Sequence, residues 1–67
     1  MTRKYTLMRP KNDPRGDRVT QVMALHGILN KDLITQGNKS FFIIDEDGGL
    51  TFAGEFNDTM RFVETLV

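Results

Sequence analysis

The sequence predicts one small α+β domain that comprises residues 1–67. Three observations predict this class: short segments that alternate in hydropathy, two segments with apolar residues at helical spacing, and a glycine-containing turn between two apolar segments. The expected order is β-α-β-β(-β)-α, with a three- to four-stranded, mostly antiparallel sheet and two helices packed on one face. Because the chain has no cysteine and one histidine, we expect neither disulfides nor a Cys/His zinc site. Its stability must come from the hydrophobic core, and a homodimer would bury further apolar area.

The first strand is expected at residues 4–8, whose alternation places Tyr5 and Leu7 on the side opposite to their neighbours. Pro10 should end this strand, because proline lacks the N–H that a strand pair needs. A loop at residues 10–16 follows, since that segment is rich in proline, asparagine, aspartate and glycine.

The first helix is expected to have Asp17 as its N-cap. Its apolar stripe consists of Val19, Val22, Met23 and His26. Two endings are consistent with the sequence. In one, Gly27 is the left-handed residue of a Schellman motif, and the next residue folds back onto the helix. In the other, the helix continues through Gly27 at a cost of about 1 kcal/mol and ends near Asn30. Either ending leaves residues 30–32 as a polar connector.

His26 is expected to be a half-buried packing residue with one hydrogen-bonded ring nitrogen, which would make the fold sensitive to acid. A catalytic role would require a nucleophile and an orienting carboxylate close to this histidine. The sequence identifies neither, because Ser40 is the sole serine and there is no cysteine. We therefore predict no catalytic residue and no enzymatic activity.

A β-hairpin is expected over residues 40–54, where two apolar segments flank the turn Asp45-Glu46-Asp47-Gly48-Gly49. In the first segment, Phe41 and Ile43 face one way while Phe42 and Ile44 face the other. A strand with two apolar faces belongs in the interior of a sheet that is covered on both sides, or on a sheet whose second face meets a partner.

A further short hairpin is expected before it, through Gly37-Asn38, which is an allowed two-residue hairpin loop. Whether residues 32–36 form its first strand is left open by the pattern. If this hairpin forms, residues 41–44 become the middle strand of a meander.

The last helix is expected to begin at an N-cap of Asn57 or Asp58. Its apolar stripe comprises Phe56, Met60, Val63 and Val67, with Thr59, Phe62 and Leu66 extending it. Phe62 lies at the edge of the stripe and is expected to be available for contact.

Charge is sorted along the chain although the net charge is zero. Residues 1–18 carry six basic and two acidic residues, a sum of +4, and residues 45–67 carry six acidic and one basic residue, a sum of −5. The remaining segment carries two basic residues and one acidic residue, a sum of +1. We expect two separate charged surfaces, one of which is used for recognition.

The acidic turn does not match a calcium-binding loop, because glycine occupies the fifth position where that motif has a carboxylate or amide. There is no phosphate-binding glycine pattern before a helix. We therefore predict no metal site and no cofactor.

These observations predict a small cytoplasmic regulatory or inhibitory protein that binds another protein and forms a homodimer. Such short chains are typical of bacterial or phage accessory proteins, and no segment has the length of a membrane span. The expected acidic partner-binding patch consists of Asp45, Glu46, Asp47 and Glu55. The expected apolar interface consists of Phe42, Ile44 and Phe62.

The alternative prediction is a regulator that binds nucleic acid through its basic N-terminal strand and loop. Its phosphate-binding residues would be Arg3, Lys4, Arg9, Lys11, Arg15 and Arg18. Near-neutral overall charge argues against it, because nucleic-acid-binding domains usually carry a clear excess of basic residues.

Overall fold

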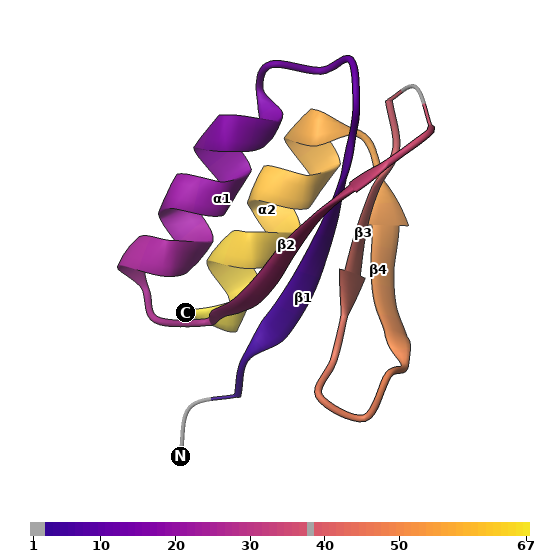
Figure 1. The fold of residues 1–67 in the computed structure, drawn as a ribbon. Helices are drawn as coiled ribbons and strands as arrows, with labels where there is room; N and C mark the ends of the chain where they lie inside the picture. Colours follow the sequence, from indigo (N-terminus) through magenta and orange to yellow (C-terminus); the bar gives the residue numbers. More distant parts are fainter. Residues whose placement is uncertain (1–2, 38) are drawn as a thin grey trace.

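The computed structural model describes residues 3–37 and 39–67 and confirms the predicted α+β class and element order. The elements are β1 (Tyr5–Pro10), α1 (Gly16–Leu25), β2 (Leu29–Thr35), β3 (Phe41–Ile44), β4 (Leu50–Gly54) and α2 (Phe56–Leu66). The strands form one mixed sheet in the order β2-β1-β3-β4, in which β1 and β2 are parallel and the other two pairs antiparallel. Both helices lie on the same side of this sheet (Figure 1).

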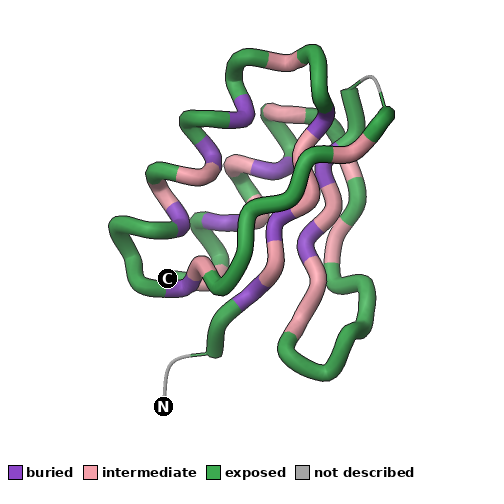
Figure 2. Tube along the Cα trace, in the orientation of Figure 1, coloured by how far each residue is buried: buried purple, intermediate pink, exposed green. Residues whose placement is uncertain are grey.

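The hydrophobic core lies between the sheet and the two helices. It is built from alternate residues of the two interior strands and from one face of each helix, as the buried segments in Figure 2 show. The side chains that are fully buried are Leu7, Val19, Met23, Phe41, Ile43, Thr59 and Val63. Strand β3 is an interior strand, between β1 and β4, but the sheet is not covered on both sides as one of the two predictions required, because both helices lie on one side (Figure 1).

Helix α1 ends in a Schellman motif at Gly27, which was one of the two predicted endings. The N–H of Ile28 donates to the carbonyl of Met23 at 3.0 Å, and the N–H of Gly27 donates to the carbonyl of Ala24 at 3.0 Å. Gly27 has φ +72°, the left-handed conformation that favours glycine. Ile28 and Met23 are both buried, so the ending also contributes to the core.

The start of α1 differs from the prediction that Asp17 is the N-cap. The helix begins at Gly16, and Asp17 lies in its first turn. The backbone already turns at Asp13, because the N–H of Gly16 donates to the carbonyl of Asp13 at 3.1 Å, while the Asp13 carboxylate accepts the N–H of Arg15 at 3.0 Å. The connecting loop is therefore residues 11–15 rather than residues 10–16, since Pro10 is still part of β1.

Strand β2 is the largest departure from the expected topology. Residues 30–32 were expected to form a connector, but they lie inside β2, which pairs with β1 in parallel. No hairpin joins β2 to β3, because β1 lies between them in the sheet. The expected loop residue Asn38 lies outside the described residues. An edge strand tolerates polar side chains on both faces, which explains how residues 30–32 fit there.

Two further expectations were wrong at helix ends. Helix α2 begins at Phe56, directly after Glu55, so neither Asn57 nor Asp58 is its N-cap. The chain is extended at Glu55 and enters the helix at the next residue, so the helix starts before both predicted caps. His26 is exposed at the C-cap of α1 instead of half-buried, because the turn at Gly27 carries the chain away from the helix stripe.

Candidate functional site

The side of the sheet away from the helices, which we call the open face, is the candidate site. Leu7 and Ile43 point toward the helices, so the residues next to them in β1 and β3 point to the open face. Strand register then defines two rows of four side chains across the sheet, because paired residues share a face. The lower row, beside the β3–β4 turn, is Lys31, Thr6, Ile44 and Leu50, and the upper row is Leu33, Met8, Phe42 and Ala53.

Contacts on the other side of the sheet support this assignment. The Thr20 hydroxyl of α1 donates to Asp32 at 3.1 Å, so Asp32 faces the helices and its neighbours in β2 face away. In β4, the ring of Phe52 stacks on Phe62 of α2 with centroids 4.8 Å apart, so Ala53 belongs to the open face. A bulge opposite Ile44 brings Leu50 rather than Thr51 into register.

The open face is mainly apolar. Six of its eight side chains are hydrocarbon or thioether groups, and only Lys31 and Thr6 are polar. Met8, Phe42 and Ile44 in the interior strands are partly exposed, whereas Leu33 and Leu50 in the edge strands are 45% and 64% exposed. An exposed apolar surface of this kind is typical of an interaction site, because the removal of apolar groups from water lowers the free energy.

The acidic turn, residues 45–49 between β3 and β4, lies at one end of the open face (Figure 1). The Asp45 carboxylate accepts the N–H of Asp47 at 3.0 Å and the N–H of Gly49 at 2.8 Å, which fixes the turn. Gly48 adopts φ +86°. Glu46 and Asp47 are exposed, so the turn presents negative charge to solvent. Asp45, Glu46 and Asp47 also line a hollow of about 200 Å³ together with Arg3.

Two residues of the predicted site lie elsewhere. Glu55 follows β4, whereas the acidic turn precedes it, so the two lie at opposite ends of that strand. Phe62 packs on the helix side of the sheet against Phe52, whereas Phe42 and Ile44 are on the open face. The structure therefore brings together Asp45, Glu46 and Asp47 as one group and Phe42 and Ile44 as another.

Sequence reasoning missed six residues of the open face, namely Lys31, Thr6, Leu33, Met8, Leu50 and Ala53. Thr6 and Met8 could have been predicted, because the alternation of the first strand places them on the side opposite to the core residues. For Lys31 and Leu33 no local signal existed, because their position depends on the parallel pairing of β2 with β1.

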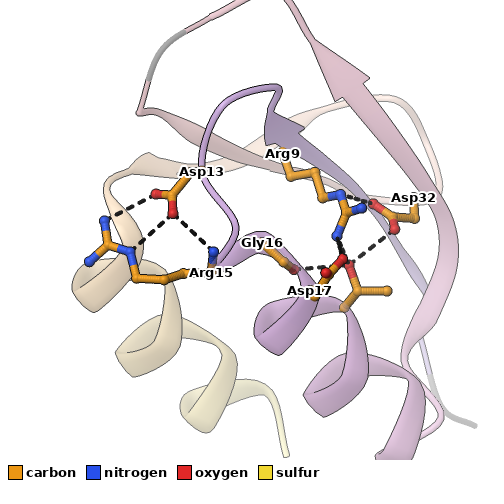
Figure 3. A network of polar contacts seen from close by, with 7 residues as sticks. Arg9, Asp13, Arg15, Gly16, Asp17 and Asp32 are labelled. Atoms are coloured by element: carbon orange, nitrogen blue, oxygen red, sulfur yellow. Dashed lines mark hydrogen bonds and ion pairs between the residues drawn. The ribbon is translucent and has the colours of Figure 1, made fainter.

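Two residues of the basic N-terminal segment, Arg9 and Arg15, form ion pairs within the fold. Arg9 lies between two carboxylates, with Nη1 2.5 Å from Asp17 Oδ1 and Nε 3.5 Å from Asp32 Oδ1 (Figure 3). The Arg9 side chain is 21% exposed. This network joins the end of β1 to the start of α1 and to β2, so its first role is to hold those elements together.

Arg15 is held in the same way by Asp13. Its Nε and Nη2 each donate to the Asp13 carboxylate at 3.0 Å, as Figure 3 shows. The Arg15 guanidinium also lies over the ring of Phe56, 4.7 Å from its centroid. The hydrogen bonds from Arg15 hold the pKa of Asp13 below its ordinary value of 3.8.

This lowered pKa predicts an acid-dependent loss of stability. A carboxyl group whose pKa is lower in the folded state stabilises the fold above its ordinary pKa, and that contribution is lost as the pH falls through the lowered value. We expect the urea midpoint of the wild type to fall more than that of the Asp13→Asn variant between about pH 5 and about pH 2. Equal losses in the two proteins would show that Asp13 does not contribute to the acid sensitivity.

Of the six basic residues of the nucleic-acid hypothesis, Arg3 and Lys4 precede β1, whereas Arg9, Lys11, Arg15 and Arg18 lie between the end of β1 and the first turn of α1. Arg9 faces α1, and Arg3 lies beside the acidic turn. Lys11 and Arg15 lie in the loop at the other end of β1, and Arg18 is on α1. Within the second group, Arg9 and Arg15 are paired with carboxylates.

Neither similarity to known proteins nor the described residues indicate a chemical activity. The chain matches no protein-family model, no curated protein and no solved structure. In residues 3–37 and 39–67 there is no group of three or more His, Asp or Glu side chains placed to hold a metal ion. Within the same residues, neither helix has the length and hydrophobicity needed to cross a bilayer.

Proposed function

We propose that this chain is a small non-enzymatic protein that regulates or inhibits another protein by binding it through the open face. The observation that carries the proposal is the exposure of apolar side chains on one face of a sheet whose interior strands pack against the helices with their other face. A preformed apolar surface loses little conformational entropy when it binds, so it favours affinity.

The acidic turn supports the same proposal. It lies at one end of the open face and carries Asp45, Glu46 and Asp47. Charges at the rim of an interface attract a partner of opposite charge and select against partners of like charge. The partner is therefore expected to present an apolar surface next to basic side chains. Apolar contacts would supply most of the affinity, and the turn would raise the association rate at low salt.

The proposal is tested by removing exposed apolar groups from the open face. We expect the wild type to capture a partner protein, distinct from the chain itself, from its source cells. The Leu33→Ser/Leu50→Ser variant should capture much less of this partner, as quantified by mass spectrometry. Both leucines are already exposed, so the fold should change little. The loss should be at least about tenfold in captured partner, because each leucine contributes on the order of 1 kcal/mol at an interface.

The matched control is Leu25→Ser/Val67→Ser, which removes two exposed apolar groups outside the open face. Leu25 is 84% exposed and Val67 is 59% exposed. This variant should capture the partner as the wild type does. Equal capture by the wild type and the open-face variant would contradict the proposal, and so would a wild type that captures no protein.

A further inference from the structure

We infer that a second copy of this chain covers the open face when no partner protein is bound, in a two-fold symmetric dimer whose sheets pack face to face. The inference rests on the proposed function, because it assumes that the open face is an interface. It adds that a second copy of the chain can bind there. The partner protein would then compete with self-association for the same side chains.

The upper row of the open face is complementary to itself under one particular symmetry. A two-fold axis parallel to the strands places β2 of each copy over β4 of the other and leaves β1 over β3. The upper rows then bring Leu33 against Ala53 of the second copy and Met8 against Phe42 of the second copy. Large side chains thus meet a small one or a flexible one, which suits the spacing of about 10 Å between packed sheets.

Charge complementarity supports the same arrangement. Lys31 lies in the lower row on β2, and the acidic turn, which follows Ile44 and precedes Leu50, extends from β3 and β4 at the same end of the sheet. The axis parallel to the strands places each Lys31 over Leu50 of the second copy, next to its acidic turn, twice in the dimer. An axis across the strands would instead place Lys31 over Leu33 of the second copy, at the end of the strands away from its acidic turn. Opposite charges therefore favour the first arrangement.

The size of the open face sets the expected affinity. Four strands at about 4.8 Å spacing and about five residues at 3.3 Å rise give a surface of roughly 300 Å² for each copy. The total is well below the ~1,600 Å² of a standard interface, so the dimer should be weak, with a dissociation constant of about 100 μM or higher. Because charged groups contribute at the rim, it should weaken further with salt.

The experiment is sedimentation equilibrium of the purified full chain from roughly 10 μM to about 1 mM at low salt. We expect the wild-type mass to rise from that of a monomer toward that of a dimer. The Lys31→Glu and Asp47→Lys variants should each raise the dissociation constant at least about tenfold through like-charge contacts. The variant with both substitutions should restore it toward the wild-type value, because the exchanged charges again attract. Both residues are exposed, so the variants should fold, as circular dichroism would check.

Lys39→Glu is the control, because Lys39 lies in the loop before β3, at the end of the sheet away from the acidic turn. It should leave the dissociation constant unchanged. A wild type that stays monomeric at about 1 mM would overturn the inference, and so would failure of the double variant to recover. These readouts need no partner protein, so a failure here is distinct from a failure of the capture experiment.

Discussion

The Phe41→Ala variant should lose about 3–5 kcal/mol of unfolding free energy, which is expected to leave the chain largely unfolded at 25 °C. Phe41 is fully buried in an interior strand, and its ring packs against Phe56 of α2 with centroids 6.3 Å apart. Truncation to alanine removes the apolar contacts and leaves a cavity between sheet and helix. Urea denaturation followed by circular dichroism would measure the change.

The next residue provides the matched control. Phe42 has the same chemistry and occupies the same strand, but it points to the open face and is partly exposed. The Phe42→Ala variant should therefore lose about 1 kcal/mol or less at concentrations where the chain is monomeric. Similar losses in the two variants would contradict the assignment of the open face, because they would mean that both rings are buried.

The contrast between these two rings also shows what the sequence could predict. The alternation of residues 41–44 predicts two apolar faces, and the structure confirms the interior position of β3. The pattern of this strand could not predict which of its two faces the helices cover, because both faces are apolar. The parallel pairing of β2 was missed for a related reason. Its residues 30–32 are polar, and a polar edge strand has the local pattern of a loop.

The separation of basic and acidic residues along the chain is kept in the ion pairs of the fold. Among the described residues, four ion pairs form: Arg9 with Asp17, Arg9 with Asp32, Arg15 with Asp13, and Arg61 with Asp58. Each of them joins residues from the same half of the chain. The basic and acidic segments therefore do not neutralise each other through these pairs. The acidic turn keeps Glu46 and Asp47 exposed, whereas Arg9 is used to hold α1 and β2.

The Gly54→Ala variant should lose about 2 kcal/mol of unfolding free energy, the second largest effect that we expect, because it overpacks the junction of β4 and α2. A Cβ at this position would lie 2.7 Å from Cζ of Phe52, closer than van der Waals contact permits. The Phe52 ring cannot move freely to make room, because it is stacked on Phe62 at a centroid distance of 4.8 Å. Thermal or urea unfolding would measure the loss.

The control for this effect is Gly37→Ala, where the nearest heavy atom to an added Cβ, Thr35 Oγ1, is 3.4 Å away. That substitution should change the unfolding free energy by no more than about 0.5 kcal/mol, since the residue is exposed and the added methyl group meets only ordinary contacts. The difference between the two variants isolates steric overlap from the general effect of replacing glycine on the unfolded chain, which is common to both. A Gly54→Ala variant as stable as Gly37→Ala would mean that the Phe52–Phe62 stack can shift at little cost. In that case the edge of the sheet at β4 is less rigid than a preformed binding surface requires.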